Sequence, residues 1–278
     1  MGCGSSKHSI KEIDSVQLPV QKQADAARIQ VESYQIDGGA VYSGEMLDGM
    51  KDGTGVQKWP NGAEYSGQWK VGKAHGKGKF IHASGDVYEG DWVEDRVEGQ
   101  GTYTHADGST YTGEWKNDLQ DGKGTERWPD GSDYTGDYAA GKKEGKGLFK
   151  WADRSYFDGE FQNNNISGFG VYVWADDRKY EGTWKENKMH GKGKFTWTDG
   201  RSYEGEYIED QKSGYGVFKW NDGSSYAGKW LNGKRHGQGT YTNANGIVRE
   251  GEWANGDRIR WVDGGKETND QETAVSPK

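Results

Sequence analysis

A 23-residue repeat constrains this chain more than any other feature of its sequence. Its copies follow the pattern Tyr-x-Gly-x-Trp with substitutions at the first and last positions, and ten copies follow one another without insertion or deletion. The first position is filled by Tyr42, Tyr65, Tyr88, Tyr111, Tyr134, Phe157, Tyr180, Tyr203, Tyr226 and Arg249. The last is filled by Met46, Trp69, Trp92, Trp115, Tyr138, Phe161, Trp184, Tyr207, Trp230 and Trp253. Such strict periodicity predicts one small structural unit built again and again.

Each repeat divides into two predicted strands. In the stretch Tyr65–Trp69, alternation places Tyr, Gly and Trp on one face and polar residues on the other. A second strand begins at a Gly-x-Gly such as Gly76–Gly78 and continues through Phe80, again with glycines and rings on one face. The repeat therefore predicts an antiparallel hairpin with one aromatic face and one charged face.

Turn residues separate these strands. Asn-Gly and Asp-Gly pairs such as Asn61–Gly62 predict short turns between repeats, because glycine readily adopts positive φ. The turns within repeats, such as Lys70–Lys73, are expected to be looser. Arg154 and Asp177 stand where other inter-repeat turns have glycine. We expect strain or a changed turn at these two positions, because other residues seldom adopt positive φ.

The composition supports a thin core rebuilt in every repeat. Glycine contributes 46 residues and apolar types only 31% of the chain, yet there are 13 tryptophans and 16 tyrosines. Glycines opposite the rings would leave room for Tyr and Trp of neighbouring hairpins to lie across the backbone. We therefore predict an all-β protein: an elongated, twisted, single-layer sheet or solenoid of tandem antiparallel hairpins, spanning residues 38–261.

These repeats resemble the MORN (membrane occupation and recognition nexus) repeat. The stretch Tyr226–Gly239 reads Tyr-Ala-Gly-Lys-Trp-Leu-Asn-Gly-Lys-Arg-His-Gly-Gln-Gly, and the likeness extends over roughly residues 39–261. Arg249 and a missing Gly-x-Gly make the tenth unit a half-repeat cap. The resemblance implies a scaffold of the kind found at membrane–cytoskeleton contacts, membrane junctions and ciliary radial spokes. Some relatives are linked to phosphoinositides.

The N-terminus carries a lipidation motif. Removal of Met1 would expose Gly2 for N-myristoylation, and Ser6 fills the motif's hydroxyl position. Cys3 follows at once and is placed for S-palmitoylation. One myristoyl chain anchors a protein only marginally, so the second acyl chain is needed for stable attachment. Residues 1–19 are therefore expected to be a flexible, doubly acylated segment, although an ordinary flexible terminus is the simpler alternative.

The segments before and after the repeat region are predicted to differ from it. Residues 20–37 are expected to contain a helix, since Val20, Ala24, Val31 and Tyr34 recur with helical spacing on one face. Such a helix would cover the open edge of the first hairpin, although a membrane-surface role is the alternative. The polar tail, residues 262–278, is expected to be disordered.

No reaction centre is expected. The single cysteine is Cys3, and no Gly-x-Ser-x-Gly elbow is present. The histidines follow the repeat phase and are too far apart for a zinc site. A net charge of −8 without a basic stripe argues against nucleic acid as a partner. The sequence thus predicts a non-enzymatic protein with no catalytic residues, metal or cofactor.

The leading functional hypothesis is a lipid-anchored scaffold. It would hold a cytoskeletal or membrane-associated protein at the cytoplasmic face of the plasma membrane or another membrane. The candidate partner-binding residues are Trp92, Tyr111, Trp115, Tyr134, Tyr180, Trp184 and Tyr203, although for most of them a purely structural role is favoured. Alternatives are direct binding of phosphoinositides or other acidic lipids, with Lys142, Lys143 and Lys146 as a patch, and a ciliary or axonemal component of the radial-spoke type. Pairing of two copies, laterally or end to end, stays open.

Overall fold

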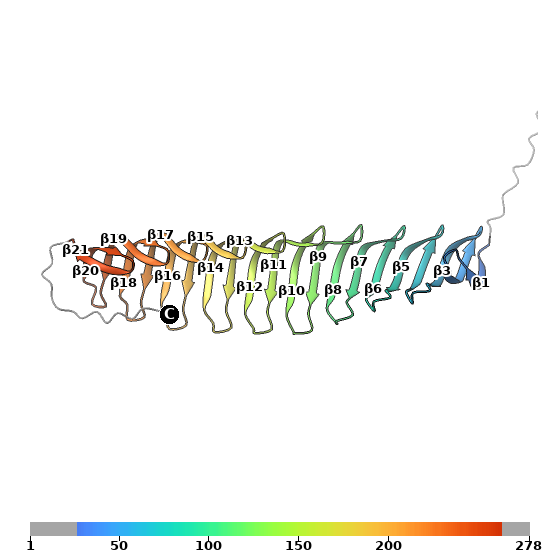
Figure 1. Ribbon diagram of the computed structural model, residues 1–278, viewed down its shortest axis with the longest axis horizontal. Helices are drawn as coiled ribbons and strands as arrows, with labels where there is room; N and C mark the ends of the chain where they lie inside the picture. Colours follow the sequence, from blue (N-terminus) through green and yellow to red (C-terminus); the bar gives the residue numbers. More distant parts are fainter. Residues whose placement is uncertain (1–26, 263–278) are drawn as a thin grey trace, which may run out of the picture.

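The computed structural model describes residues 27–262, which form a single open sheet of 21 antiparallel strands. Its first eleven strands are β1 (Ile29–Gln35), β2 (Val41–Leu47), β3 (Met50–Lys58), β4 (Glu64–Lys70), β5 (Lys73–Ile81), β6 (Val87–Val93), β7 (Arg96–Thr104), β8 (Thr110–Lys116), β9 (Leu119–Arg127), β10 (Asp133–Ala139) and β11 (Lys142–Lys150). The others are β12 (Tyr156–Gln162), β13 (Asn165–Val173), β14 (Lys179–Lys185), β15 (Lys188–Thr196), β16 (Ser202–Ile208), β17 (Gln211–Lys219), β18 (Ser225–Leu231), β19 (Lys234–Thr242), β20 (Val248–Ala254) and β21 (Asp257–Trp261). Every strand pairs only with its neighbours in sequence, so the sheet extends as a long rod (Figure 1). The predicted all-β fold of tandem hairpins is confirmed.

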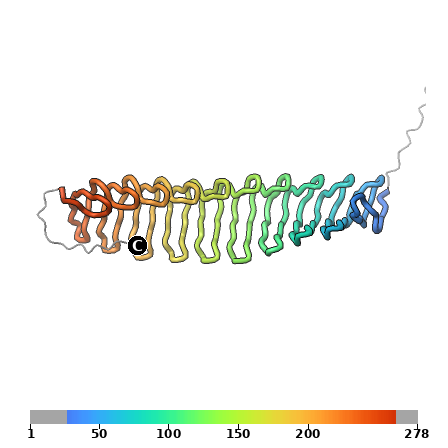
Figure 2. The backbone as a smooth tube through the Cα atoms, viewed as in Figure 1, coloured from blue at the N-terminus to red at the C-terminus, as the bar shows by residue number. Residues whose placement is uncertain are grey.

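Each hairpin contains a wide bulge. Gly67 of β4 faces Gly78 of β5, but two residues later Trp69 faces Ala74, so Gln68 lies opposite three residues of β5. The side chain of Gln68 accepts a hydrogen bond of 2.8 Å from the backbone N–H of the residue before Gly78. Bulges bend a strand and increase its twist. In Figure 2 the backbone bends over along the upper edge of the rod.

The first glycine of each Gly-x-Gly therefore has a different role from the one expected. Gly76 has φ +68° at the bulge, and a Cβ there would meet the side chain of Gln68 on the polar face. Only the second glycine, Gly78, lies beneath a ring of the aromatic face. Simple alternation could not separate the two, because a bulge shifts the side-chain phase.

The tight turns are those within repeats, opposite to expectation. Val71 and Gly72 form a two-residue loop with φ values of +48° and +79°, and Lys70 pairs directly with Lys73. Positive φ at both central residues matches the right-handed twist of hairpin strands. The turn between repeats is longer: Trp59–Ala63 is closed by a 2.9 Å bond from the N–H of Trp59 to the carbonyl of Ala63.

The two turns without glycine keep the geometry of the others. Arg154 and Asp177 have φ values of +76° and +65°. Each donates its N–H over 3.0 Å to the ring-bearing residue three positions earlier, as Gly131 does to Trp128. The expected strain at these positions is therefore present, while a changed turn is not. Left-handed backbone costs an ordinary L-residue about 1–2 kcal/mol.

Replacing Arg154 with glycine is expected to stabilise the protein by up to about 1 kcal/mol. Relief of the left-handed backbone outweighs the greater freedom that glycine gives the unfolded chain. The midpoint of urea unfolding should rise for Arg154→Gly. The exposed neighbour Asp153 accepts hydrogen bonds from Ser155 and is unaffected by the change. A lower midpoint would show that the arginine side chain contributes more than the backbone strain costs.

The aromatic core links each hairpin to its predecessor. Tyr65 lies over its own hairpin, because a Cβ at Gly78 would be 2.5 Å from its Cζ and its hydroxyl donates to the carbonyl of Gln68 over 2.9 Å. Trp69 instead reaches the preceding hairpin, where its indole N–H donates to the carbonyl of Gly55 over 3.1 Å. Rings thus do reach neighbouring hairpins, but those at the Trp position do so, Tyr138 and Tyr207 included, whereas those at the first position of the repeat lie over their own hairpin. The most deeply buried large side chains are Tyr42, Tyr65, Tyr88, Tyr111, Tyr134, Phe157, Tyr180, Tyr203 and Tyr226.

A strand covers the N-terminal edge of the first repeat, where a helix was expected. β1 pairs antiparallel with β2, with an irregularity between Val31 and Tyr34. Arg28, just before it, forms a 2.8 Å ion pair with Asp52. The helix prediction for residues 20–37 is therefore wrong over β1, because backbone pairing with an open sheet edge outweighs a weak helical periodicity. Residues 20–26, the lipidation motif and residues 263–278 lie outside the described residues.

Candidate functional site

One position of the aromatic face varies from repeat to repeat. It is the residue of the second strand that faces the Trp position across the hairpin, and we call it the slot position. Its occupants are Lys51, Ala74, Val97, Gln120, Lys143, Ile166, Met189, Lys212, Arg235 and Arg258. Since the flanking rings recur while this residue changes, the slot position sets the local shape and charge of the aromatic face.

Lys212 shows what surrounds a slot position. Its Nζ lies 5.1 Å from the ring centroids of Trp197 and Phe218, 5.2 Å from that of Trp230 and 5.4 Å from that of Tyr203. Burial among these rings lowers the pKa of Lys212 to about 8. Aromatic faces attract ammonium groups within about 6 Å, so the four rings form a box that holds a cation.

Lys143 occupies its slot through an ion pair. Its Nζ lies 2.5 Å from Oε2 of Glu126, and both side chains are largely buried, with exposures of 15% and 20%. The hydroxyl of Tyr138 donates to the same carboxylate oxygen over 3.0 Å. The lysine is therefore fixed inside the aromatic face and is not available at the surface.

Removing one partner of this pair should destabilise the protein. We expect Glu126→Ala to cost about 3 kcal/mol, because it leaves a partly buried ammonium group without its counter-charge. The triple variant Glu126→Phe, Tyr138→Phe and Lys143→Ile uses the apolar residue types of nearby repeats. It should stay within about 1 kcal/mol of the natural chain. Urea unfolding of both variants measures the difference, and equal losses would contradict the assigned pairing.

The slots of the second and third repeats hold only Ala74 and Val97, and a groove remains there. This N-terminal groove encloses about 590 Å³ and runs over both positions. Its ring-bearing walls are formed by Trp59, Tyr65, Trp69, Phe80, His82, Tyr88, Trp92, Tyr103 and Trp115. A concave, mostly apolar surface with a few polar groups is the usual form of a binding site.

Two carboxylates lie at the rim of the N-terminal groove. Asp95 accepts a 2.7 Å bond from the N–H of Ala74, and Asp118 accepts an equivalent 2.7 Å bond from Val97. Within the described part of the chain, neither forms an ion pair. Lys51 stands at the other end, with its Nζ 3.6 Å from the ring centroid of Trp69, and burial lowers its pKa to about 8. The groove thus combines aromatic walls with two rim carboxylates, of which Asp95 attracts the ammonium group of Lys51.

A family model for the MORN repeat matches nine consecutive stretches: residues 42–64, 65–87, 88–110, 111–133, 134–156, 157–177, 180–200, 203–225 and 226–248. Together they cover most of the chain. This protein belongs to the MORN-repeat family. MORN repeats occur in scaffold proteins that bind membranes or other proteins.

Solved structures give weaker likenesses to this MORN-repeat chain. The TCP10 domain of Danio rerio CPAP is 13% identical, with a TM-score of 0.41, and the match covers 74% of this chain and 98% of that one. The SAS-4 (dCPAP) TCP domain of Drosophila melanogaster is 16% identical with a TM-score of 0.35, over 56% and 86% of the two chains. No curated protein matches the sequence. The family assignment therefore rests on the repeat match.

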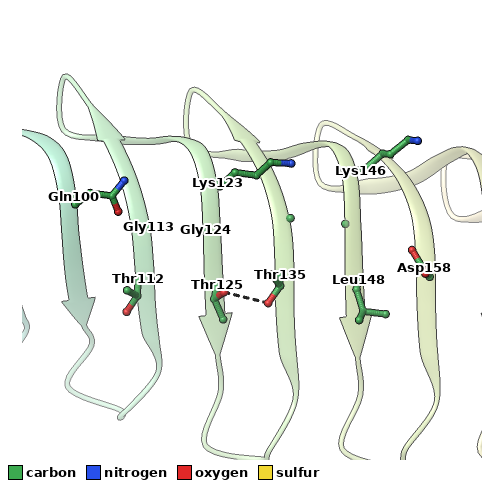
Figure 3. Close-up of a pocket in the computed structure, with 12 residues that line it drawn as sticks. Gln100, Thr112, Gly113, Lys123, Gly124, Thr125, Thr135, Lys146, Leu148 and Asp158 are labelled. Carbon is green, nitrogen blue, oxygen red and sulfur yellow. Dashed lines mark hydrogen bonds between the residues drawn. The ribbon is translucent and has the colours of Figure 1, made fainter.

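The polar face of the MORN sheet is flatter. A depression of about 510 Å³ lies over β7–β12, and Figure 3 shows its threonines and lysines on neighbouring strands. Thr125 and Thr135 share a hydrogen bond of 3.1 Å, and Lys123 pairs with Asp137. These contacts occupy one lysine and two threonines of the depression, which Lys146 and Asp158 also line.

The lysine patch considered for acidic lipids does not form. Lys143 is paired inside the aromatic face, whereas Lys146 lines the depression on the polar face. Lys142 bonds to the side chain of Asn163 over 3.0 Å. The three lysines therefore do not converge on one surface. Alternation along a bulged strand separates neighbours that look clustered in sequence.

The candidate partner-binding residues divide into two groups. Trp92 and Trp115 line the N-terminal groove. Tyr111, Tyr134, Tyr180 and Tyr203 are at most 1% exposed, and Trp184 is 7% exposed. None of these five lines the N-terminal groove. Burial alone does not set them apart, because the groove walls Tyr65 and Tyr88 are only 2% and 1% exposed. Residues such as Trp59, Phe80 and Tyr103 were missed as groove walls, and the small side chain of Ala74 was the signal that could have found them.

No helix among residues 27–262 is long and apolar enough to cross a membrane. The same residues contain no group of three or more metal-binding side chains.

Proposed function

We propose that this MORN-repeat protein is a lipid-anchored scaffold. Acyl chains on Gly2 and Cys3 would hold it at the cytoplasmic face of a membrane, and the N-terminal groove would bind a protein partner. The observation that supports partner binding is the open aromatic groove of about 590 Å³ over Ala74 and Val97, the smallest of the slot residues. The anchoring half of the proposal rests on the sequence motif.

Binding, and not catalysis, is the role that the groove's chemistry supports. Its walls are mainly rings and hydrocarbon, and its rim carboxylates already accept backbone hydrogen bonds. A reaction centre instead brings an activated nucleophile or an acid–base pair together around a reacting atom. The N-terminal groove offers a contact surface for a side chain or a short segment.

Direct recognition of acidic lipids has less support. Several lysines of the polar face are paired with carboxylates, as Lys77 is with Asp91 over 2.7 Å and Lys123 with Asp137. Such pairs reduce the positive potential that anionic headgroups require. The axonemal alternative has no specific observation in its favour.

The test is recruitment of the partner. The natural chain and Gly2→Ala, each with a C-terminal tag, are expressed in cells, and bound proteins are cross-linked, identified and located by fractionation. We expect both forms to bind the same protein, which should lie in the membrane fraction only with the natural chain. A bound protein whose location does not depend on Gly2 would refute the tethering role.

A further inference from the structure

Part of the N-terminal groove has the same ring spacing as the box of four rings around Lys212. In that box, ring centroids are 5.5 Å apart for Trp197 and Phe218 and 5.1 Å apart for Tyr203 and Trp230. Those of Phe218 and Trp230 are 6.3 Å apart. The rings come from an inter-repeat turn, both strands of one hairpin and the first strand of the next. This arrangement is a product of the repeat, so it should recur wherever the same four positions carry rings.

Rings with the same spacing surround Ala74, although their planes are tilted differently: Trp59 and Phe80 cross at 77°, whereas Trp197 and Phe218 cross at 50°. Trp59 and Phe80 are 5.6 Å apart, Tyr65 and Trp92 are 5.2 Å apart, and Phe80 and Trp92 are 6.3 Å apart. Each distance is within 0.1 Å of its counterpart around Lys212. The four rings around Ala74 therefore form a second box of the same size. What it lacks is the cationic side chain, because alanine ends at Cβ.

Charge favours a cation in the box around Ala74. Asp95 and Asp118 lie at the rim, and within the described residues neither forms an ion pair. Lys51 lies in the preceding slot, where its ammonium group bonds to Oε1 of Gln57 over 2.6 Å and the carboxylate of Asp95 attracts it. The chain itself places lysine or arginine in other slots, with Lys143, Lys212 and Arg235 all close to ring faces. Slot positions thus accommodate long aliphatic side chains that end in a cationic group.

We propose that the box around Ala74 binds a lysine side chain of the partner protein. This deepens the proposed function, on which it rests, by naming the chemistry that the N-terminal groove recognises. The lysine would enter where Lys212 lies in its own repeat. Its stem would pack on Ala74, its ammonium group would face Trp59, Tyr65, Phe80 and Trp92, and Asp95 would supply the counter-charge. The groove continues over Val97, which gives room for the next residues of the partner.

The probe is n-butylammonium, the side chain of lysine without its backbone, and 1-butanol is its uncharged control. Indole N–H signals of Trp92, assigned from Trp92→Phe, are followed by NMR in Gly2→Ala protein. We expect saturable shifts with n-butylammonium at millimolar concentration, and binding at least tenfold weaker for 1-butanol. Equal binding of the two would show an apolar pocket without preference for a cation and would overturn the proposal.

Two substitutions at Ala74 test the location. Ala74→Lys and Ala74→Met place in the slot the residue types that other repeats already carry there, at Lys212 and Met189. Both variants should fold, and both should lose n-butylammonium binding. If either folded variant bound the probe as well as the parent, the assignment of the site would be wrong.

Lys212→Ala provides a gain-of-function test. It should open a second box, so that n-butylammonium also shifts the indole signal of Trp230 and raises the variant's midpoint of thermal unfolding. The parent should show neither effect. The thermal shift is measurable even if the variant is destabilised. Absence of both effects in Lys212→Ala would contradict the equivalence of the two boxes.

A lipid headgroup is the competing source of a cation. Phosphatidylcholine vesicles are therefore added to Gly2→Ala protein, alongside a peptide Gly-Gly-Lys-Gly-Gly. Peptide binding that is lost in Ala74→Lys supports a protein partner, whereas vesicle binding lost in the same variant overturns it. If the peptide does not bind, recruitment of a partner to the membrane in cells can still be observed. The proposed function and this inference can therefore fail separately.

Discussion

Gly147→Ala is expected to destabilise the protein by about 3 kcal/mol, a large effect for one methyl group. Gly147 faces Gly136 across the hairpin, and the ring of Tyr134 lies against both. A Cβ on Gly147 would be 2.5 Å from Cε2 and 2.6 Å from Cζ of that ring. Because Tyr134 is fully buried, its ring has no free space into which to move. The midpoint of urea unfolding measures the loss.

Gly131→Ala is the matched control. Gly131 lies in the turn before the same hairpin with φ +91°, and a Cβ there would meet nothing within 4 Å. The control therefore introduces only the backbone cost of a left-handed alanine, about 1 kcal/mol. If the two variants lose equal stability, close packing of Tyr134 on glycine is not what holds the hairpin together.

Loss of Gly2 is expected to abolish membrane attachment altogether. A myristoyl chain alone gives an association constant on the order of 10⁴ M⁻¹, so about half of a singly acylated protein binds at roughly 0.1 mM accessible lipid. Each buried CH₂ of a second chain adds about 0.8 kcal/mol, which makes release of doubly acylated protein negligible. Sedimentation with vesicles should therefore separate three states: doubly acylated natural protein, Cys3→Ser with one chain, and Gly2→Ala with none.

Ser5→Ala is the control for this series, because it changes a neighbouring residue while leaving Gly2, Cys3 and Ser6 in place. It should sediment like the natural protein. Mass spectrometry of each purified form establishes which chains are attached. Full sedimentation of Gly2→Ala that carries no lipid would place the membrane contact in the folded repeats and not at the N-terminus.

The repeat phase was enough to predict the sheet, because the period of 23 fixes which residues share a face in every hairpin. It could not predict the bulge, since Gly76 and Gly78 alternate in sequence as two residues of one face would. The strand β1 was missed for a related reason. Its residues do not follow the repeat pattern, and they form a strand by pairing with the otherwise open edge of β2.

The candidate site was predicted only in part. The pattern drew attention to the rings that recur, such as Tyr111 and Tyr134, and these are the buried ones. The N-terminal groove arises instead where the pattern varies, at Ala74 and Val97. Whether a variable position lies among rings or in solvent depends on the bulge, and hence on geometry that alternation alone does not contain.

Because each strand pairs only with its neighbours in sequence, the length of the sheet is proportional to the number of repeats. At about 4.8 Å per strand, each two-stranded unit adds roughly 10 Å along the sheet, and nothing else in the fold fixes the total. A protein shortened by one unit, residues 157–179, should keep its remaining hairpins and reach about 10 Å less far. Since the N-terminal groove lies in the second and third units, this deletion would leave the groove's height above the N-terminal edge unchanged while moving the far end closer. The number of repeats thus sets the distance between the N-terminal groove and the far end of the sheet.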